Sequence, residues 1–411
     1  MKRVLFIAHR VPYPPDKGER VRAFHEIQAL AARWRVTLAA LAHRPEDFQA
    51  AEALARWCER VLVARAGGAP GLARGALALL RGRSVTEGYF GSRALQRAIR
   101  DEAAREPFDL VVAYSSGTLP HALAVPAPAR VMDLVDVDSI KWASYADASR
   151  WPRRWFCRLE SRRVARLERR AVEACQAVFL VSPEEARALG AAGDGIGAMG
   201  NGVDTAYFTP AARGAAAAPS LVFTGTMDYR PNVDGVRWFV REVWPGLKRE
   251  VPNLVFTIVG RDPTRDVLRL AEVPGVRVTG AVPDVRPYLR EATAAVVPLL
   301  IARGIQNKVL EAMAMGRAVI ASPGAIEGLE VERGVDLLEA ETAEEWRRCI
   351  VDLLADAGLR GRLERSARAC VVSRYAWDAR MRPLVSVCER LMGERPPGPA
   401  AAPPSGKGPT V

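Results

Sequence analysis

Residues 294–316 read AAVVPLLIARGIQNKVLEAMAMG, and they contain a strand, a loop and a helix in one short run. The segment Ala294 to Val297 predicts a strand buried on both faces, because all its side chains are apolar, and Pro298 ends it. Apolar residues at helical spacing predict a helix from about Gln306 to Met315, which Gly316 stops. This order of elements is the repeating unit of a parallel α/β fold.

The same alternation runs along the whole chain and divides it in two. In the first half the predicted strands lie near 4–9, 35–41, 60–64, 109–114, 129–134 and 177–181, with helices near 19–33, 46–57 and 92–105. After a stretch rich in proline and alanine, further strands are predicted near 220–224, 254–259, 276–279, 294–297, 318–321 and 335–338. We therefore expect an α/β fold of two Rossmann-like domains, 1–208 and 220–376, joined by a linker at 209–219.

Composition narrows the functional classes only in part. The net charge of +12 comes with 59 basic residues of which 53 are arginine, a bias that genomic base composition also produces. Six cysteines and four histidines show no metal-ligand spacing, so we expect reduced thiols and no metal. No apolar run approaches the about 20 residues of a membrane span. A cytoplasmic globular protein is expected, with a disordered tail at 393–411.

The loop before the helix at Gln306 has the chemistry of an anion site. In an open parallel sheet, ligands bind at the carboxyl ends of the strands, where helix N-termini direct backbone N–H groups at anions. Lys308 lies in the first turn of the helix, where it opposes the helix dipole unless an anion is bound. Glu311 follows one turn later on the same face. An ordinary surface pair of lysine and glutamate has the same spacing.

Two other loops join a first strand to a helix. Gly225 and Arg230 follow the strand at 220–224, where a glycine permits close approach and an arginine holds a diphosphate. Gly18, Arg20 and Arg22 follow the strand at 4–9 and offer a second entry for a substrate. Most glycine-rich loops like the one at Gly225 are merely turns, and the loop at Gly18 is equally compatible with a surface loop stiffened by prolines.

These segments are similar to the retaining family 4 glycosyltransferases of GT-B fold. The resemblance rests on Lys308 with the run from Glu311 to Gly316, on Asn201 to Pro210, and on Phe223 to Met227. With Pro14–Arg22, Asp133–Trp142 and Arg303–Met315, the chain resembles the subgroup of sugar transferases found with PEP-CTERM/exosortase exopolysaccharide systems. This implies two sheets that face each other across a cleft, and a helix at 377–392 that crosses back to the N-terminal domain.

The resemblance also implies roles for individual residues. A nucleotide sugar would be bound without a metal, its diphosphate neutralised by Lys308 and Arg230 and its ribose hydroxyls contacted by Glu311. The other implied donor contacts are Gly225, Thr226, Asn232, Val282, Arg303, Gly304, Ile305, Gln306 and Asn307. The implied acceptor contacts are Gly18, Arg20, Arg22, Ser115 and His121. The sugar would be transferred with retention, and a lipid-linked or oligosaccharide acceptor is expected.

The sequence departs from the family pattern at positions that contact the transferred sugar or the donor phosphates in the family. Arg303 stands where the family has the first glutamate of a pair, and Ser115 stands near the position of a common histidine, with His121 two turns later. Thr226 and Asn232 fall near the usual arginine and lysine of the first nucleotide-domain loop, so Arg230 is their expected substitute.

Residues 150–170 form a segment rich in arginine and aromatic residues. Nine arginines lie between Arg150 and Arg170, together with Trp151, Trp155 and Phe156. This mixture suits an anionic membrane surface, which would make the protein peripheral on the inner face of the cytoplasmic membrane. It equally suits a solvated helix face.

Two other functions use similar sequence features. A GT-B-like nucleotide-sugar epimerase needs carboxylates at the sugar, where this chain has Arg303. A basic nucleic-acid-binding protein would bind through the 150–170 segment, but no nucleic-acid motif is present, so we expect no nucleic-acid partner. The glycosyltransferase is the favoured prediction.

Overall fold

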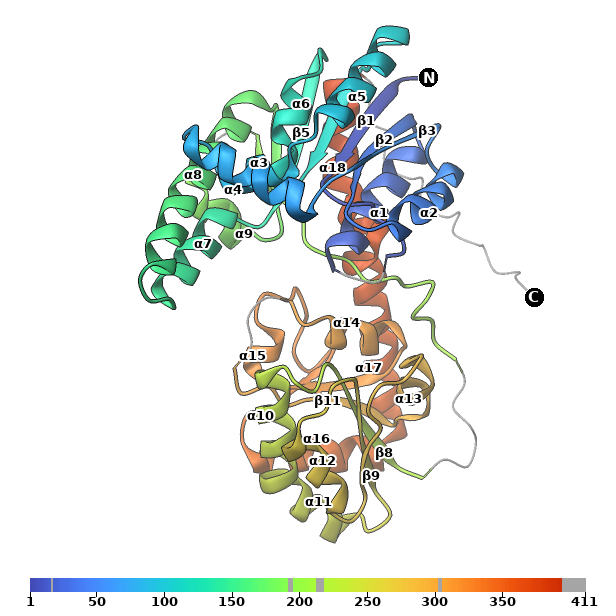
Figure 1. The fold of residues 1–411 in the computed structure, drawn as a ribbon. Coiled ribbons are helices and arrows are strands. Elements are labelled where there is room, and N and C mark those ends of the chain that lie inside the picture. The colour runs from blue at the N-terminus through green and yellow to red at the C-terminus, as the bar shows by residue number, and fades with distance from the viewer. Residues whose placement is uncertain (16–17, 191–194, 212–217, 302–304, 394–411) are drawn as a thin grey trace, which may run out of the picture. The chain divides into compact units, whose positions relative to one another are not determined.

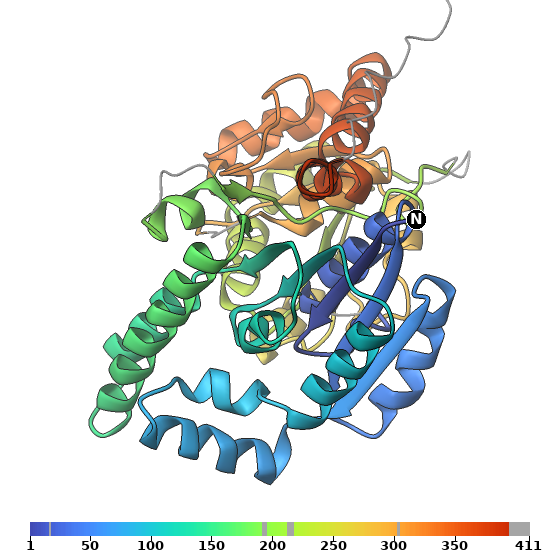
Figure 2. The ribbon, with the colours of Figure 1, turned by 90° about the horizontal axis from the view of Figure 1, so that it is seen from above.

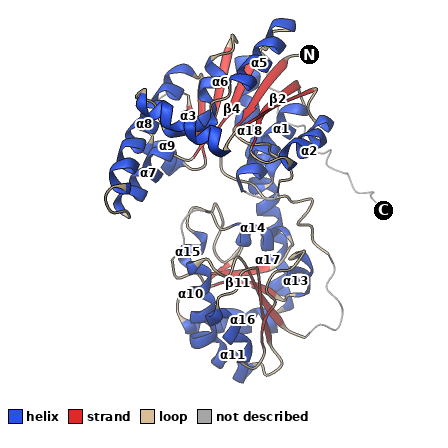
Figure 3. Cartoon of the chain, in the orientation of Figure 1, coloured by secondary structure: helices blue, strands red, loops and turns tan. Residues whose placement is uncertain are grey.

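The structure is a computed structural model that describes residues 1–15, 18–190, 195–211, 218–301 and 305–393. It divides into two compact units, each described here by itself. Unit 1 comprises Met1–Gly200 and the described residues from Met381 onward, and unit 2 comprises Asn201–Arg380. Figure 3 shows that helices cover both faces of the strands in each unit. The tail expected to be disordered lies beyond the described residues.

Unit 1 is built on a fully parallel sheet in the order β3-β2-β1-β4-β5-β6-β7. Its strands are β1 (Arg3–Ala8), β2 (Arg35–Ala42), β3 (Arg60–Arg65), β4 (Leu110–Tyr114), β5 (Ala129–Val135), β6 (Ala177–Leu180) and β7 (Ile196–Ala198). Its helices are α1 (Gly18–Ala31), α2 (Glu46–Glu52), α3 (Gly68–Leu80), α4 (Val85–Phe90), α5 (Arg93–Arg105), α6 (Leu119–Leu123), α7 (Asp138–Asp147), α8 (Arg153–Ala174) and α9 (Pro183–Ala188). The first six strands match the predicted ones.

Burial on both faces explains why the central strands are apolar throughout. All six residues of β1 are buried, and Leu5 and Ile7 belong to a core shared with α5, α6 and α8. The alternate residues Val4 and Phe6 face the other side of the sheet and are equally inaccessible. Figures 1 and 2 show α7 and α8 side by side at one edge of the unit.

Unit 2 repeats this architecture in the order β10-β9-β8-β11-β12-β13, again fully parallel. Its strands are β8 (Ser220–Thr224), β9 (Val255–Val259), β10 (Val276–Val278), β11 (Ala294–Val297), β12 (Ala318–Ala321) and β13 (Leu338–Glu339). Its helices are α10 (Arg230–Trp238), α11 (Trp244–Glu250), α12 (Arg265–Arg269), α13 (Arg286–Glu291), α14 (Asn307–Ala314), α15 (Pro323–Ile326), α16 (Ala343–Ala355) and α17 (Ala357–Cys370). The last strand starts three residues beyond the predicted position at 335.

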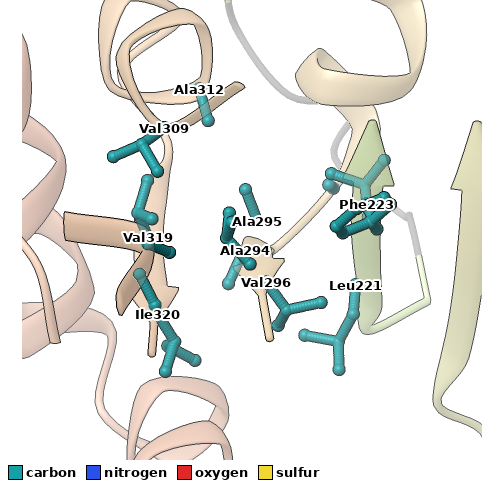
Figure 4. Close-up of a cluster of buried hydrophobic side chains, with 14 of the residues drawn as sticks. Leu221, Phe223, Ala294, Ala295, Val296, Val309, Ala312, Val319 and Ile320 are labelled. Carbon is teal, nitrogen blue, oxygen red and sulfur yellow. The ribbon is translucent and has the colours of Figure 1, made fainter. Parts of the chain in front are cut away.

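The core of unit 2 surrounds β11, the strand predicted first from the sequence. Figure 4 shows its Ala295 and Val296 between Leu221 and Phe223 of β8 on one side and Val319 of β12 on the other. β11 pairs with both neighbouring strands in parallel.

The chain enters unit 2 at Asn201, earlier than the predicted boundary at 208. Val203 forms a bridge with Ala376, and a Cβ on Gly202 would lie 2.8 Å from the Trp377 ring. Arg368 also donates hydrogen bonds to the carbonyls of Thr205 and Phe208. α18 (Trp377–Leu391) begins in unit 2, and its residues from Met381 onward belong to unit 1, where Glu389 pairs with Arg33.

Candidate functional site

A pocket of about 580 Å³ lies in unit 2, at the carboxyl ends of β8, β9 and β10 and beside the start of α14. This is where a doubly wound parallel sheet binds its ligands. Its lining residues are Phe208, Thr224, Gly225, Thr226, Asn232, Gly260, Arg261, Ala281, Val282, Val285, Ile305, Gln306, Asn307, Lys308 and Glu311. We call it the donor pocket.

Two glycines bring the loops after β8 and β9 into contact at the floor of the donor pocket. A Cβ on Gly260 would lie 1.6 Å from the Gly225 carbonyl oxygen, so any side chain there would separate the loops. A Cβ on Gly225 would meet the Asn232 amide at 2.7 Å and Lys308 Cε at 3.3 Å. Both positions therefore require glycine for close backbone approach.

Asn232 ties the loop after β8 to α10 and lines the donor pocket. Its Nδ2 donates a hydrogen bond of 2.9 Å to the Thr226 carbonyl, and the side chain is buried. Within the described residues, its Oδ1 has no hydrogen-bond partner. Most buried polar atoms in proteins have a hydrogen-bond partner, which a bound water or ligand can supply.

Lys308 is the central cation of the donor pocket. It lies in the first turn of α14, where its Nζ donates to Gln306 Oε1 at 3.1 Å and lies 5.7 Å from the centre of the Phe223 ring. Burial lowers the pKa of Lys308 to about 8, with Glu311 opposing the change. Burial also raises the pKa of Glu311, against the attraction of Lys308. Both charges are therefore incompletely compensated by the protein.

Most of the predicted donor residues meet in this pocket. Gly225, Thr226 and Asn232 come from the β8 loop and α10, and Val282 comes from the loop after β10. Ile305, Gln306 and Asn307 precede or begin α14. The predicted contacts Arg303 and Gly304 lie outside the described residues.

Arg230 is not part of the donor pocket, contrary to the prediction. It is the first residue of α10, its side chain is 90% exposed, and it pairs with Asp234 one turn on. Besides Lys308, Arg261 is a cation that lines the pocket; it follows β9 and lies 3.7 Å from Asp262. Its position directly after a predicted strand was the signal available in the sequence.

The predicted acceptor residues of unit 1 are less accessible than expected. Arg22 is buried and donates to both oxygens of Asp133, at 2.6 and 3.1 Å, and to the Met199 carbonyl. His121 is also buried, with its Nε2 3.0 Å from the Phe90 carbonyl oxygen, and burial lowers its pKa. Neither side chain is accessible to an acceptor in this structure, because each is buried and forms its contacts inside unit 1.

The other predicted acceptor residues lie near the carboxyl ends of the strands. Gly18 begins α1, and Arg20 pairs with Asp47 at 3.4 Å. Ser115 follows β4 with a φ of 73°, and its amide donates to the Asp133 carbonyl.

Across the described residues, no three His, Cys, Asp or Glu side chains are arranged to hold a metal. The same residues include no helix long and apolar enough to span a membrane.

Comparison with known proteins agrees with this geometry. Residues 218–356 match the family described as Glycosyl transferases group 1. No curated protein matches the chain. Among solved structures, sucrose-phosphate synthase from Thermosynechococcus elongatus superimposes with a TM-score of 0.62 at 17% identity, covering 96% of this chain and 100% of that one. HepE from Anabaena in complex with UDP gives 0.61 at 16%, covering 95% and 100%.

These matches settle the fold and the type of enzyme. The chain has the GT-B fold, with two parallel-strand α/β units. Residues 218–356, which match the group 1 glycosyl transferases, lie in unit 2, and so does the donor pocket. The chain is therefore a glycosyltransferase.

Proposed function

We propose that this glycosyltransferase takes a sugar from a nucleotide sugar bound in the donor pocket and transfers it, with retention, to a saccharide acceptor carried on a lipid. The observation that carries the proposal is Lys308, a largely buried lysine at a helix N-terminus whose pKa is lowered to about 8. Such a cation gains most from an anionic ligand, because a phosphate supplies the charge compensation that burial has removed.

The pocket has a place for each part of such a donor. The diphosphate would lie at the N-terminus of α14 against Lys308, with Arg261 at the rim. Glu311 would accept hydrogen bonds from the two ribose hydroxyls, and the apolar side chains of Val282 and Val285 would flank the base. HepE, which shares the fold, has been solved with UDP and with UDP-glucose, which supports a nucleotide donor here.

The proposed reaction exchanges one bond at the anomeric carbon. The bond to the donor phosphate oxygen breaks, a bond to the acceptor hydroxyl oxygen forms on the same face, and the hydroxyl proton passes to a donor phosphate oxygen. The nucleoside diphosphate leaves with the bonding electrons. Lys308 stabilises the charge that develops on it, so the protein's own cations rather than a metal carry this task.

We place the enzyme in exopolysaccharide assembly on the cytoplasmic side of a membrane. The support is the resemblance of Pro14–Arg22, Asp133–Trp142 and Arg303–Met315 to the PEP-CTERM/exosortase-associated transferases. A lipid-linked acceptor would be reached at an anionic membrane surface, and the arginines of Arg150–Arg170 suit such a surface. The position of Arg303 is where we expect the transferred sugar to be selected.

Thermal unfolding with a panel of donors tests the proposed function. UDP-, GDP- and ADP-sugars are added to the full chain, and a donor present at about 100 times its Kd should stabilise the protein by about 2.7 kcal/mol. Turnover is then measured with and without a saccharide acceptor, since transfer requires the acceptor and epimerisation does not. Absence of stabilisation by every donor would contradict the proposal.

A further inference from the structure

Helix α3 presents an apolar stripe to solvent. Its leucines Leu72, Leu77 and Leu80 are exposed, and Leu80 keeps 85% of its surface accessible. Ala69, Ala73 and Ala76 lie between them and are exposed as well. The spacing of three and four residues places all six side chains on one face of the helix. We call this face the leucine stripe.

The opposite face of α3 fixes the orientation of the leucine stripe. Gly71, Gly75 and Ala78 are buried there, and α3 packs closely on α4. A Cβ on Gly88 of α4 would lie 2.5 Å from the Arg74 carbonyl oxygen and 2.6 Å from Ala78 Cβ. Because this close crossing accepts only very small residues, α3 cannot rotate to bury its leucines. The stripe is a fixed feature of the fold.

The exposed side chains that border the leucine stripe include arginines. Residues 60–86 contain Arg60, Arg65, Arg74, Arg81 and Arg83, of which Arg60 pairs with Glu102 and Arg83 with Glu87. Arg65 and Arg81, which border α3, are both exposed. An apolar helix face bordered by arginines is the pattern of a helix that lies in the interface of an anionic membrane.

Helix α8 adds a second element with the same chemistry. Arg163 of α8 donates to the carbonyls of Leu79 and Arg83, so α8 lies beside the end of α3 (Figure 1). At the start of α8, Trp155 is exposed, as is Trp151 just before it. Tryptophan favours the boundary between lipid and water. Glu160 of α8 is buried against α4, so it does not offset the exposed arginines.

We propose that α3 docks unit 1 on an anionic phospholipid bilayer, with Leu72, Leu77 and Leu80 inserted among the lipids. A bilayer fits better than a second copy of the chain, because two copies meeting at this face would bring like charges together. The inference concerns unit 1 and does not depend on the donor pocket, which lies in unit 2.

Vesicle flotation of the full chain tests the proposal. One set of vesicles contains equal parts of phosphatidylcholine and phosphatidylglycerol, and the other contains phosphatidylcholine alone. The wild type should float with the anionic vesicles and not with the neutral ones. The triple variant Leu72→Gln/Leu77→Gln/Leu80→Gln should lose binding by about tenfold or more. The substituted side chains are exposed, so its thermal unfolding should match the wild type.

A matched control removes three exposed apolar side chains elsewhere. The variant Leu268→Gln/Val335→Gln/Val372→Gln in unit 2 should bind the anionic vesicles like the wild type. Equal flotation of the wild type and the leucine-stripe variant would overturn the proposal, as would equal binding to neutral vesicles or no binding to either kind. A wild-type dimer that the leucine-stripe variant converts to a monomer, without vesicle binding, would instead assign the face to a second copy.

Discussion

Arg22 in unit 1 and Lys308 in unit 2 are both cations on helices that pack against a parallel sheet, yet their surroundings differ. Arg22 is buried against Asp133, and although burial disfavours its charge, the carboxylate raises its pKa. Lys308 has an amide oxygen as its hydrogen-bond partner, and burial lowers its pKa to about 8. The protein compensates the first cation with a carboxylate, whereas Glu311 compensates the second only in part.

This contrast separates a cation in the core of unit 1 from a cation that lines a pocket. Glu26 lies 3.4 Å from Arg22, and burial, with Asp133, raises the pKa of its carboxyl. The cluster around Arg22 is therefore closed within unit 1. Around Lys308, a pocket of about 580 Å³ opens instead. The four predictions below test this difference.

The largest effect is expected for Arg22→Met. This substitution leaves Asp133 buried without its main partner, and breaking a buried pair in this way costs about 3–5 kcal/mol. Chemical denaturation of the variant should show this loss in the free energy of unfolding. The exposed Arg97→Met variant serves as a control for removal of one charge from the same unit. A loss as small as that of the control would show that the Arg22 cluster is not structural.

Lys308→Met, in contrast to Arg22→Met, should lower the turnover number without lowering the free energy of unfolding. Loss of one donor to the leaving phosphate should lower the turnover number by about 100-fold. The free energy of unfolding should stay the same or rise, because burial penalises the lysine charge. Steady-state kinetics and denaturation are compared with Arg269→Ala, which removes an exposed charge outside the pocket. Turnover near the wild-type value would remove Lys308 from the mechanism.

Glu311→Gln should weaken donor binding with a smaller effect on turnover. A carboxylate that accepts two ribose hydroxyls contributes through charged hydrogen bonds, so we expect the Kd of the donor to rise about tenfold. Calorimetric titration with the nucleotide sugar measures the change. Glu341→Gln, an exposed glutamate of the same unit, should bind the donor like the wild type. An unchanged Kd for Glu311→Gln would place the ribose elsewhere.

The smallest expected effect is on donor binding, and it distinguishes the two exposed arginines Arg261 and Arg230. Arg261→Ala should weaken donor binding about threefold, since a solvent-exposed ion pair contributes little. Arg230→Ala should leave it unchanged, because Arg230 lies outside the donor pocket. The same titration compares the two variants. A larger effect for Arg230 would restore the role predicted from the sequence.

The sequence predicts elements well where one segment alone determines them. The apolar runs of β1 and β11 and the helix containing Lys308 are found where expected. The loops at Gly225 and Lys308 were also correctly brought to one edge of a sheet, because parallel topology alone places them there.

The remaining features depend on contacts between distant segments. Arg22 was predicted to contact the acceptor, and its burial was not foreseen because its partner Asp133 lies 111 positions away. Arg230 was predicted and Arg261 was not, because only the structure shows that Arg261 lines the donor pocket and that Arg230 does not. No helix was predicted at α3, since its apolar face is turned to solvent and its inner face consists of small residues. Short strands such as β7 carry too little pattern to be recognised.

The most direct test of the central claim is the proton balance of nucleoside diphosphate binding, measured by calorimetry in buffers of different ionisation enthalpy. At about pH 8.5, Lys308 is partly neutral before binding and becomes protonated when a diphosphate raises its pKa, so the wild type should take up protons. Lys308→Met should take up none. Equal proton uptake by both proteins, or none by either, would contradict the assignment of Lys308 as the cation that binds the diphosphate of the donor.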